Sequence, residues 1–249
     1  MKPRTAGLFL AIGLTAFGAE QVTAQEIAIS LGDGSLTGRL LQLFLLVTVL
    51  SLVPGLAIMI TCFPFIVTVL AILRQGIGLQ QSPPNMLLVS LALFLTWFVM
   101  EPVFTEAWIL GAVPLLDGSI EIEAAFEQGI GPFRDFMAGR VDPGTFVSLA
   151  ALRGDPPDVA SIDLLASQDL SLLVPSFLLS EIERAFQVGF LIFLPFLIID
   201  LVVAAILMSM GMMMVPPAIV SLPFKLAFFV VADGWTLISE ALVRGYFPS

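Results

Sequence analysis

The sequence predicts an all-α membrane protein made of two long apolar helical hairpins, with an acidic exported segment of short helices between them. Of its 249 residues, 58% are hydrophobic and only 12% are charged, and the mean hydropathy is +1.04. Such a chain cannot cover itself with polar side chains, so it needs lipid or partner subunits. Its apolar residues lie in long stretches, and turns rich in Gly, Pro or Met divide these stretches into hairpins.

Residues 1–24 are predicted to be a signal peptide. Lys2 and Arg4 provide the positive start of such a segment. The apolar core that follows, residues 6–17, is too short to span about 30 Å of hydrocarbon. The N-terminus is therefore expected to be exported.

The expected cleavage position is Ala24. Val22 and Ala24 are the small or branched residues that suit the positions before a cleavage site. Cleavage there leaves Gln25 as the mature N-terminus, followed by a short exported segment over residues 25–38. Cleavage after Gly18 and an uncleaved first anchor remain as alternatives.

Residues 39–110 are predicted to form the first apolar hairpin. Its first stretch, from Leu40 to Leu73, would be about 50 Å long as a single helix, more than one bilayer crossing needs. Pro54-Gly55 and Pro64 are the expected breaks, because proline removes a backbone donor and crowds the preceding turn. A polar turn over residues 74–85 leads into the second arm.

Residues 111–180 are predicted to be the exported segment. Acidic residues accumulate there with Gly and Pro, and the basic residues are only Arg134, Arg140 and Arg153. The spacing of Ile, Ala and Phe over residues 120–137 indicates short amphipathic helices. Asp142-Pro143-Gly144 and Asp155-Pro156-Pro157 are turn signals. The low Lys and Arg content agrees with the tendency of exported segments.

Residues 181–249 are predicted to form the second hairpin, whose tight turn is rich in methionine. Because methionine is flexible and polarizable, several copies on a Gly- and Pro-limited bend predict a deformable apolar closure, the gate or plug of a pore. The alternative is that they are ordinary membrane hydrophobes. The candidate gate residues are Met208, Met210, Met212, Met213 and Met214.

Four charged residues in or beside the apolar stretches call for partners, because an unpaired charge in such surroundings is costly. Asp200 and Asp233 are expected to be buried charges, Asp233 in either an interface belt or a tight packing site. Glu181 and Lys225 are expected to form a salt bridge. Straight helices place these two about 24 Å apart along one hairpin, so the bridge is expected between neighbouring copies.

The chain offers few groups for catalysis or metal binding. It has no histidine and a single cysteine, Cys62, so no intrachain disulfide can form. Ser176 and Ser180 lack a histidine partner, and the carboxylates lack metal-ligand spacing. We therefore expect no enzyme activity, no cofactor and no metal. The net charge of −10 also argues against nucleic acid as a partner.

Several long motifs, in the right order, carry a resemblance to a known family. The most specific run from Val174 to Phe190 and from Pro223 to Trp235. Shorter matches cover residues 73–78, 81–85 and 210–217. Over about residues 40–249 the chain resembles the FliP family of type III secretion export gate proteins.

The resemblance implies a subunit of the flagellar export gate in the bacterial inner membrane and the flagellar basal body. Its implied partners are other copies of itself in a ring, smaller export-gate membrane subunits, membrane lipid and the unfolded flagellar proteins that pass through the pore. The injectisome counterpart of the family is an alternative. A proton-coupled secondary transporter, with Asp200 and Asp233 as proton carriers, and a passive assembly scaffold are alternatives from other classes.

Overall fold

The computed structural model describes residues 36–79, 83–154, 169–212 and 214–247. Every regular element within these ranges is helical, which confirms the predicted all-α class. The chain divides into two compact units, residues 1–55 and 56–249. The predicted signal peptide and Ala24 lie outside the described residues.

The first unit holds most of helix α2 (Leu36–Met59). The helix is apolar all round, as expected of a segment surrounded by lipid or by other apolar helices. Pro54 lies inside α2 and does not end it, so the break expected at Pro54-Gly55 is not found. A proline costs one backbone hydrogen bond, and an apolar helix can continue through that loss.

Helix α3 (Phe63–Ile77) begins after a short interruption at residues 60–62. Pro64 lies in its first turn, where the missing backbone N–H has no intrahelical acceptor to lose, so the break expected at Pro64 is confirmed. The helix ends at Gly78, whose φ of 89° is left-handed and favours glycine. The N–H of Gly78 donates to the carbonyl of Gln75 at 3.0 Å.

The second arm is longer than the sequence predicted. Helix α4 (Asn85–Ala107) runs through a π-helical turn, η1 (Trp108–Ala112), into α5 (Val113–Leu116). Pro102 lies inside α4 without ending it. The arm therefore extends six residues beyond residue 110, where the first hairpin was predicted to end.

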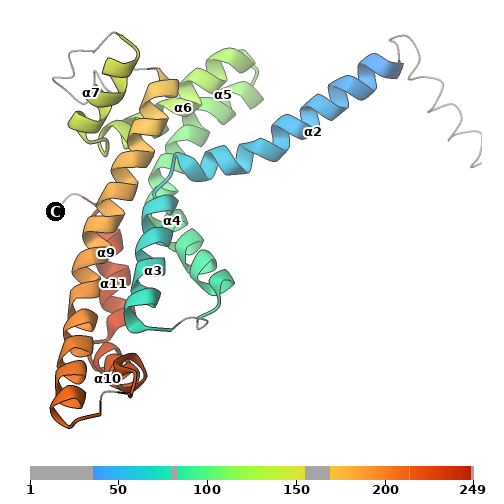
Figure 1. Ribbon diagram of the computed structural model, residues 1–249. Coiled ribbons are helices and arrows are strands. Elements are labelled where there is room, and N and C mark those ends of the chain that lie inside the picture. Colours follow the sequence, from blue (N-terminus) through green and yellow to red (C-terminus); the bar gives the residue numbers. More distant parts are fainter. Residues whose placement is uncertain (1–35, 80–82, 155–168, 213, 248–249) are drawn as a thin grey trace, which may run out of the picture. The chain divides into compact units, whose positions relative to one another are not determined.

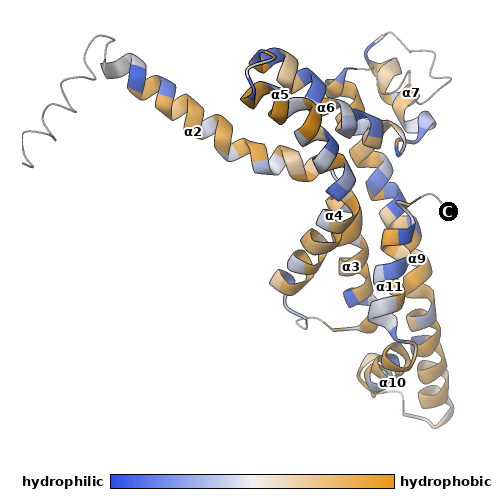
Figure 2. Cartoon of the chain, turned by 180° about the vertical axis from the view of Figure 1, so that it is seen from behind, coloured by the Kyte–Doolittle hydropathy of each residue, from blue (hydrophilic) through white to orange (hydrophobic). Residues whose placement is uncertain are grey.

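In the described part of the acidic segment, two short helices follow, α6 (Ile122–Ala138) and α7 (Pro143–Leu152). The Asp142-Pro143-Gly144 sequence is the start of α7 rather than a free turn. The side chain of Asp142 caps this helix and Pro143 occupies its first turn, the ordinary chemistry of a helix N-terminus. Figure 2 shows hydrophilic residues on α6, whereas α7 is a short apolar helix.

Helix α9 (Leu170–Ser209) is 40 residues long and continues through Pro175 and Pro195. It begins inside the stretch that the sequence assigned to the exported segment. Figure 1 shows α9 running from α7 at one end to α10 at the other.

The last apolar stretch is broken in two, where the sequence predicted one arm. Helix α10 (Pro217–Val231) and helix α11 (Gly234–Arg244) meet at an angle of 63°. Asp233 takes a left-handed φ of 49° at the break. A Cβ on Gly234 would lie only 2.2 Å from the Phe229 ring, so the bend depends on glycine there.

Within the described residues, three helical segments are long and apolar enough to cross a membrane, or four if α10 and α11 count as one bent span. The central packing is between α3 and α9. A Cβ on Gly189 would meet the Ile72 side chain at 2.5 Å, so the two backbones approach closely. The main apolar core joins α3, α4, α9, α10 and α11.

Candidate functional site

The carboxylate of Glu181 is the most enclosed charge among the described residues, with 0% of its side chain exposed. Its Oε1 accepts from Nε of Arg140 at 3.0 Å and from Nη1 of Arg184 at 3.2 Å. Its Oε2 accepts from the hydroxyl of Tyr246 at 2.6 Å. These four residues are called the Glu181 cluster below. Each carboxylate oxygen is satisfied, which offsets the cost of burying the charge.

The Glu181 cluster joins three parts of the chain. Arg140 follows α6, Glu181 and Arg184 lie one turn apart on α9, and Tyr246 follows α11. The guanidinium of Arg140 also donates to the carbonyl of Gly245 at 3.0 Å and lies 4.1 Å from the centre of the Tyr246 ring. The segment directly after α11 is therefore tied to the end of α6 and to the first third of α9.

Asp142 and Ser180 extend this contact toward α7. The backbone N–H of Asp142 donates to Oγ of Ser180 at 2.9 Å. The carboxylate of Asp142 accepts from the backbone N–H of Thr145 at 2.7 Å, and this hydrogen bond lowers the pKa of Asp142. The start of α7 is thus fastened to α9 beside the Glu181 cluster.

Lys225 lies in a second polar cluster, near the other end of α9. Its Nζ donates to Oδ2 of Asp200 at 2.6 Å and to the carbonyl of Gly76 at 3.1 Å. Oγ of Ser221 donates to Oδ1 of Asp200 at 2.5 Å. These four residues are called the Lys225 cluster. Lys225 and Ser221 are buried, whereas the side chain of Asp200 is 33% exposed.

The Gly76 carbonyl explains why a cation belongs in this position. Gly76 lies in the last turn of α3, where carbonyls lack intrahelical partners and the helix dipole favours positive charge. A Cβ on Gly76 would meet the rings of Phe193 and Phe196 at 3.1 Å. Lys225 therefore neutralises Asp200 on α9 and at the same time caps α3.

The structure separates the two residues that were expected to bridge. The bridge between copies was expected because each charge would otherwise be buried alone. Within the chain, however, Glu181 and Lys225 each have other partners, so that reason does not hold. A contact between two copies involves a second chain and stays a prediction. The partner that the structure gives Lys225 is Asp200 on the same chain.

Asp233 differs from its expected role as a buried charge. Its side chain is exposed in the single chain, and its carboxylate accepts from the hydroxyl of Thr236 at 3.3 Å. Its surroundings are those of a tight packing site, since Gly234 touches Phe229 and the Phe229 and Trp235 rings are 5.3 Å apart.

The Met-rich bend (residues 208–216) joins α9 to α10 and is exposed. Met208 is 60% exposed, Met210 64%, Met212 41% and Met214 97%, whereas Met213 lies outside the described residues. Such exposure of large apolar side chains needs a neighbouring chain, lipid or a closed pore to cover them.

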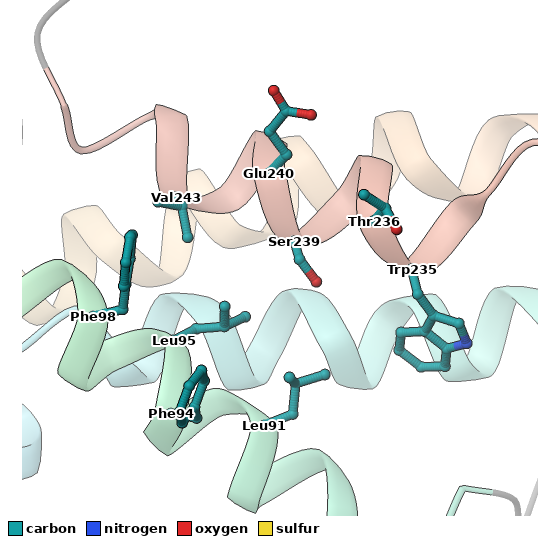
Figure 3. A pocket seen from close by; sticks show the side chains of 9 residues that line it. All are labelled: Leu91, Phe94, Leu95, Phe98, Trp235, Thr236, Ser239, Glu240 and Val243. Atoms are coloured by element: carbon teal, nitrogen blue, oxygen red, sulfur yellow. The ribbon is translucent and has the colours of Figure 1, made fainter.

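Two apolar grooves open on this unit. One, of about 500 Å³, lies between α9 and α10. Its lining is apolar: side chains on one face of the stretch between Ile198 and Met210 form one side, and Val220 and Phe224 form the other. The other, of about 720 Å³, lies between α4 and α11. Figure 3 shows Phe94 and Phe98 of α4 opposite Trp235 and Val243 of α11, with the Glu240 carboxylate pointing away from α4.

The polar groups of the site form ion pairs and hydrogen bonds between helices. In the described ranges no three Cys, Asp or Glu side chains gather as metal ligands. The charged groups satisfy one another and join helices. Sequence reasoning missed Arg140 and Tyr246 as partners of Glu181. Tyr246, the only tyrosine in an apolar C-terminal arm, was the available signal.

Comparisons with known proteins agree on one family. The family model for the FliP family matches residues 46–242. The chain is similar to the flagellar biosynthetic protein FliP of Caulobacter vibrioides, with 48% identity over 95% of this chain and 88% of the relative. It is 48% identical to that of Agrobacterium fabrum over 86% of each chain. It is 44% identical to that of Bacillus subtilis over 82% of this chain and 91% of the relative.

Proposed function

Because the chain belongs to the FliP family, we propose that several copies of it assemble as a ring with smaller membrane partners and line the pore of the flagellar type III protein export gate. Family membership makes the chain a membrane component of the flagellar protein export apparatus. The proposal adds the ring, the pore and the unfolded flagellar proteins that pass through it. On this proposal the chain catalyses no reaction and lies in the flagellar basal body.

The single observation that carries the pore role is the exposed Met-rich bend. Four described methionines at the tip of a hairpin expose large apolar side chains that the chain itself does not cover. In a ring, the bends of several copies would converge on the axis and form a soft apolar seal. The apolar grooves beside α10 and between α4 and α11 leave further surface for neighbouring subunits or lipid.

A strain that lacks the gene tests the export role. It should be non-motile and should not secrete filament subunits, and the restored gene should recover both. Normal motility and secretion would exclude the export role. A strain that keeps both while losing proton-coupled uptake of a solute would favour the transporter alternative.

Replacing residues 212–214 with alanine tests the seal. The resting membrane should leak ions and small solutes several-fold more than the wild type, because alanine removes the flexible side chains that fill the pore. The matched control replaces Ile219, an exposed apolar residue in the first turn of α10, with alanine and should not leak. Unchanged permeability with normal amounts of assembled protein would leave the methionines as packing residues.

A further inference from the structure

The second hairpin is held to the rest of its unit by a polar contact close to the Met-rich bend. Ser221 lies one turn after the start of α10. Its hydroxyl donates to Asp200 on the opposite arm. Asp200 lies nine residues before the end of α9, which is about 14 Å of helix. The Lys225 cluster is thus the attachment point behind the bend.

Between this attachment and the bend an apolar groove runs along part of the two arms, although Val203 and Leu207 of α9 are buried. The groove of about 500 Å³ starts beside Asp200 and extends along α9 to Met210 on the bend. Apolar side chains line this groove, and apolar packing is non-directional, so it sets the relative position of the arms less strictly than a hydrogen bond does. The position of the bend therefore depends on how the arms are held at the Lys225 cluster.

The same contact reaches a third helix that is itself firmly placed. Helix α3 packs closely along α9: a Cβ on Gly189 would lie 2.5 Å from the Ile72 side chain, and a Cβ on Gly76 would lie 3.1 Å from two Phe rings of α9. Lys225 donates to the carbonyl of Gly76 at the end of α3 and to Asp200 on α9. The ammonium group thereby holds α10 against two closely packed helices.

Stability alone does not account for this arrangement. Replacing a buried ion pair with apolar residues of similar volume is often neutral or stabilising, so a merely stabilising contact could be apolar. Unlike an apolar contact, the contact of Lys225 requires one geometry, because its ammonium group must reach the Asp200 carboxylate and the Gly76 carbonyl at once.

We propose that Lys225 and Asp200 are positioning residues for the Met-rich bend. Their ion pair, with Ser221 and the Gly76 carbonyl, holds α10 at one place on α3 and α9, and so sets where the bend lies in the gate. The expected consequence, a tight resting seal, rests on the proposed function. The position of α10 on α3 and α9 is a property of a single chain and can be measured without reference to that function.

The test uses the double variant Asp200→Asn with Lys225→Met, which keeps the volume and removes both charges. Assembled protein should be present at wild-type amounts, because the paired charges are removed together. Resting permeability to small solutes should rise several-fold. The matched control is Glu240→Gln, which removes the exposed Arg244–Glu240 pair and should leave permeability unchanged.

A distance measurement reads the position of the bend directly. Spin labels are placed at Gln75→Cys and Met214→Cys, both exposed sites, in a Cys62→Ala background, and the labelled chain is diluted with unlabelled chain in the purified assembly. The distance distribution should be narrow with the native pair and broader or shifted in the double variant. The single variant Lys225→Arg, which keeps the charge, should lie closer to the wild type.

The outcomes separate this inference from the proposed function. A broadened distance together with a leak supports both. An unchanged distance overturns the positioning role, whether or not the membrane leaks. A broadened distance without a leak, when alanine at residues 212–214 also causes no leak, supports the positioning role and rejects the seal.

Discussion

The Glu181 cluster yields the prediction that the structure defines most closely. Glu181→Gln removes the only negative charge that faces Arg140 and Arg184 in the cluster, and Tyr246→Phe removes one hydrogen bond and leaves the ring in place. Both variants should destabilise the fold. The first should cost more, because it leaves a buried cation without its counter-ion.

The magnitudes follow from exposure and bonding. Breaking a buried pair costs about 3–5 kcal/mol, and the lower end applies here because the side chain of Arg184 is 36% exposed and can be hydrated. Tyr246→Phe should cost about 1.5–3 kcal/mol, the range for a hydrogen bond to a charged group. For a chain of this size, 1 kcal/mol shifts the unfolding midpoint by about 2–4 °C.

Cys62 provides the assay. It is the only cysteine of the chain and is fully buried. Burial raises its pKa to about 12, so the folded protein holds very little reactive thiolate. A maleimide that fluoresces on reaction with a thiol should therefore report unfolding of the purified protein during a temperature ramp.

The expected order of midpoints is wild type, then Tyr246→Phe, then Glu181→Gln, the last lower by about 6–12 °C. Glu240→Gln is the matched control, because its pair with Arg244 is exposed and such pairs contribute about 0.2–1 kcal/mol. If Glu181→Gln labels at the same temperature as this control, the cluster contributes nothing to stability and the reasoning fails.

Three further predictions concern other parts of the chain. Asp142→Asn should keep the α7 cap at neutral pH but remove an acid-dependent loss of stability. Because the pKa of Asp142 is lowered in the folded chain, its carboxylate stabilises the fold at pH values above the ordinary pKa, and this contribution is lost as the pH falls through the folded-state pKa. Unfolding midpoints measured across this pH range should show the loss in the wild type and not in the variant. Gly189→Ala should cost about 1–3 kcal/mol through overpacking, and Ile72→Ala in the same chain should recover part of it; an unchanged midpoint for Gly189→Ala would contradict the close approach of α3 and α9. Mass spectrometry of the membrane-inserted protein should find a mature N-terminus near Gln25, and detection of residues 6–17 would contradict cleavage.

The candidate site was only partly predictable. The sequence showed which charges were costly, because a Glu, Asp or Lys inside an apolar stretch stands out by itself. It did not show the pairs. Glu181 meets Arg140, 41 residues earlier, and Tyr246, 65 residues later, and such contacts depend on how helices cross rather than on spacing.

The sequence by itself determined the all-α class, the need for a membrane or partners, the break at Pro64 and the family. These follow from local composition, from proline geometry and from long motifs. The tertiary structure decided that α9 continues through two prolines, that the last arm bends at Asp233, and that Lys225 pairs with Asp200. The physical reason is the same in each case: whether a proline, a glycine or a charge ends, bends or joins helices depends on the neighbours that pack against it, and those neighbours are distant in the chain.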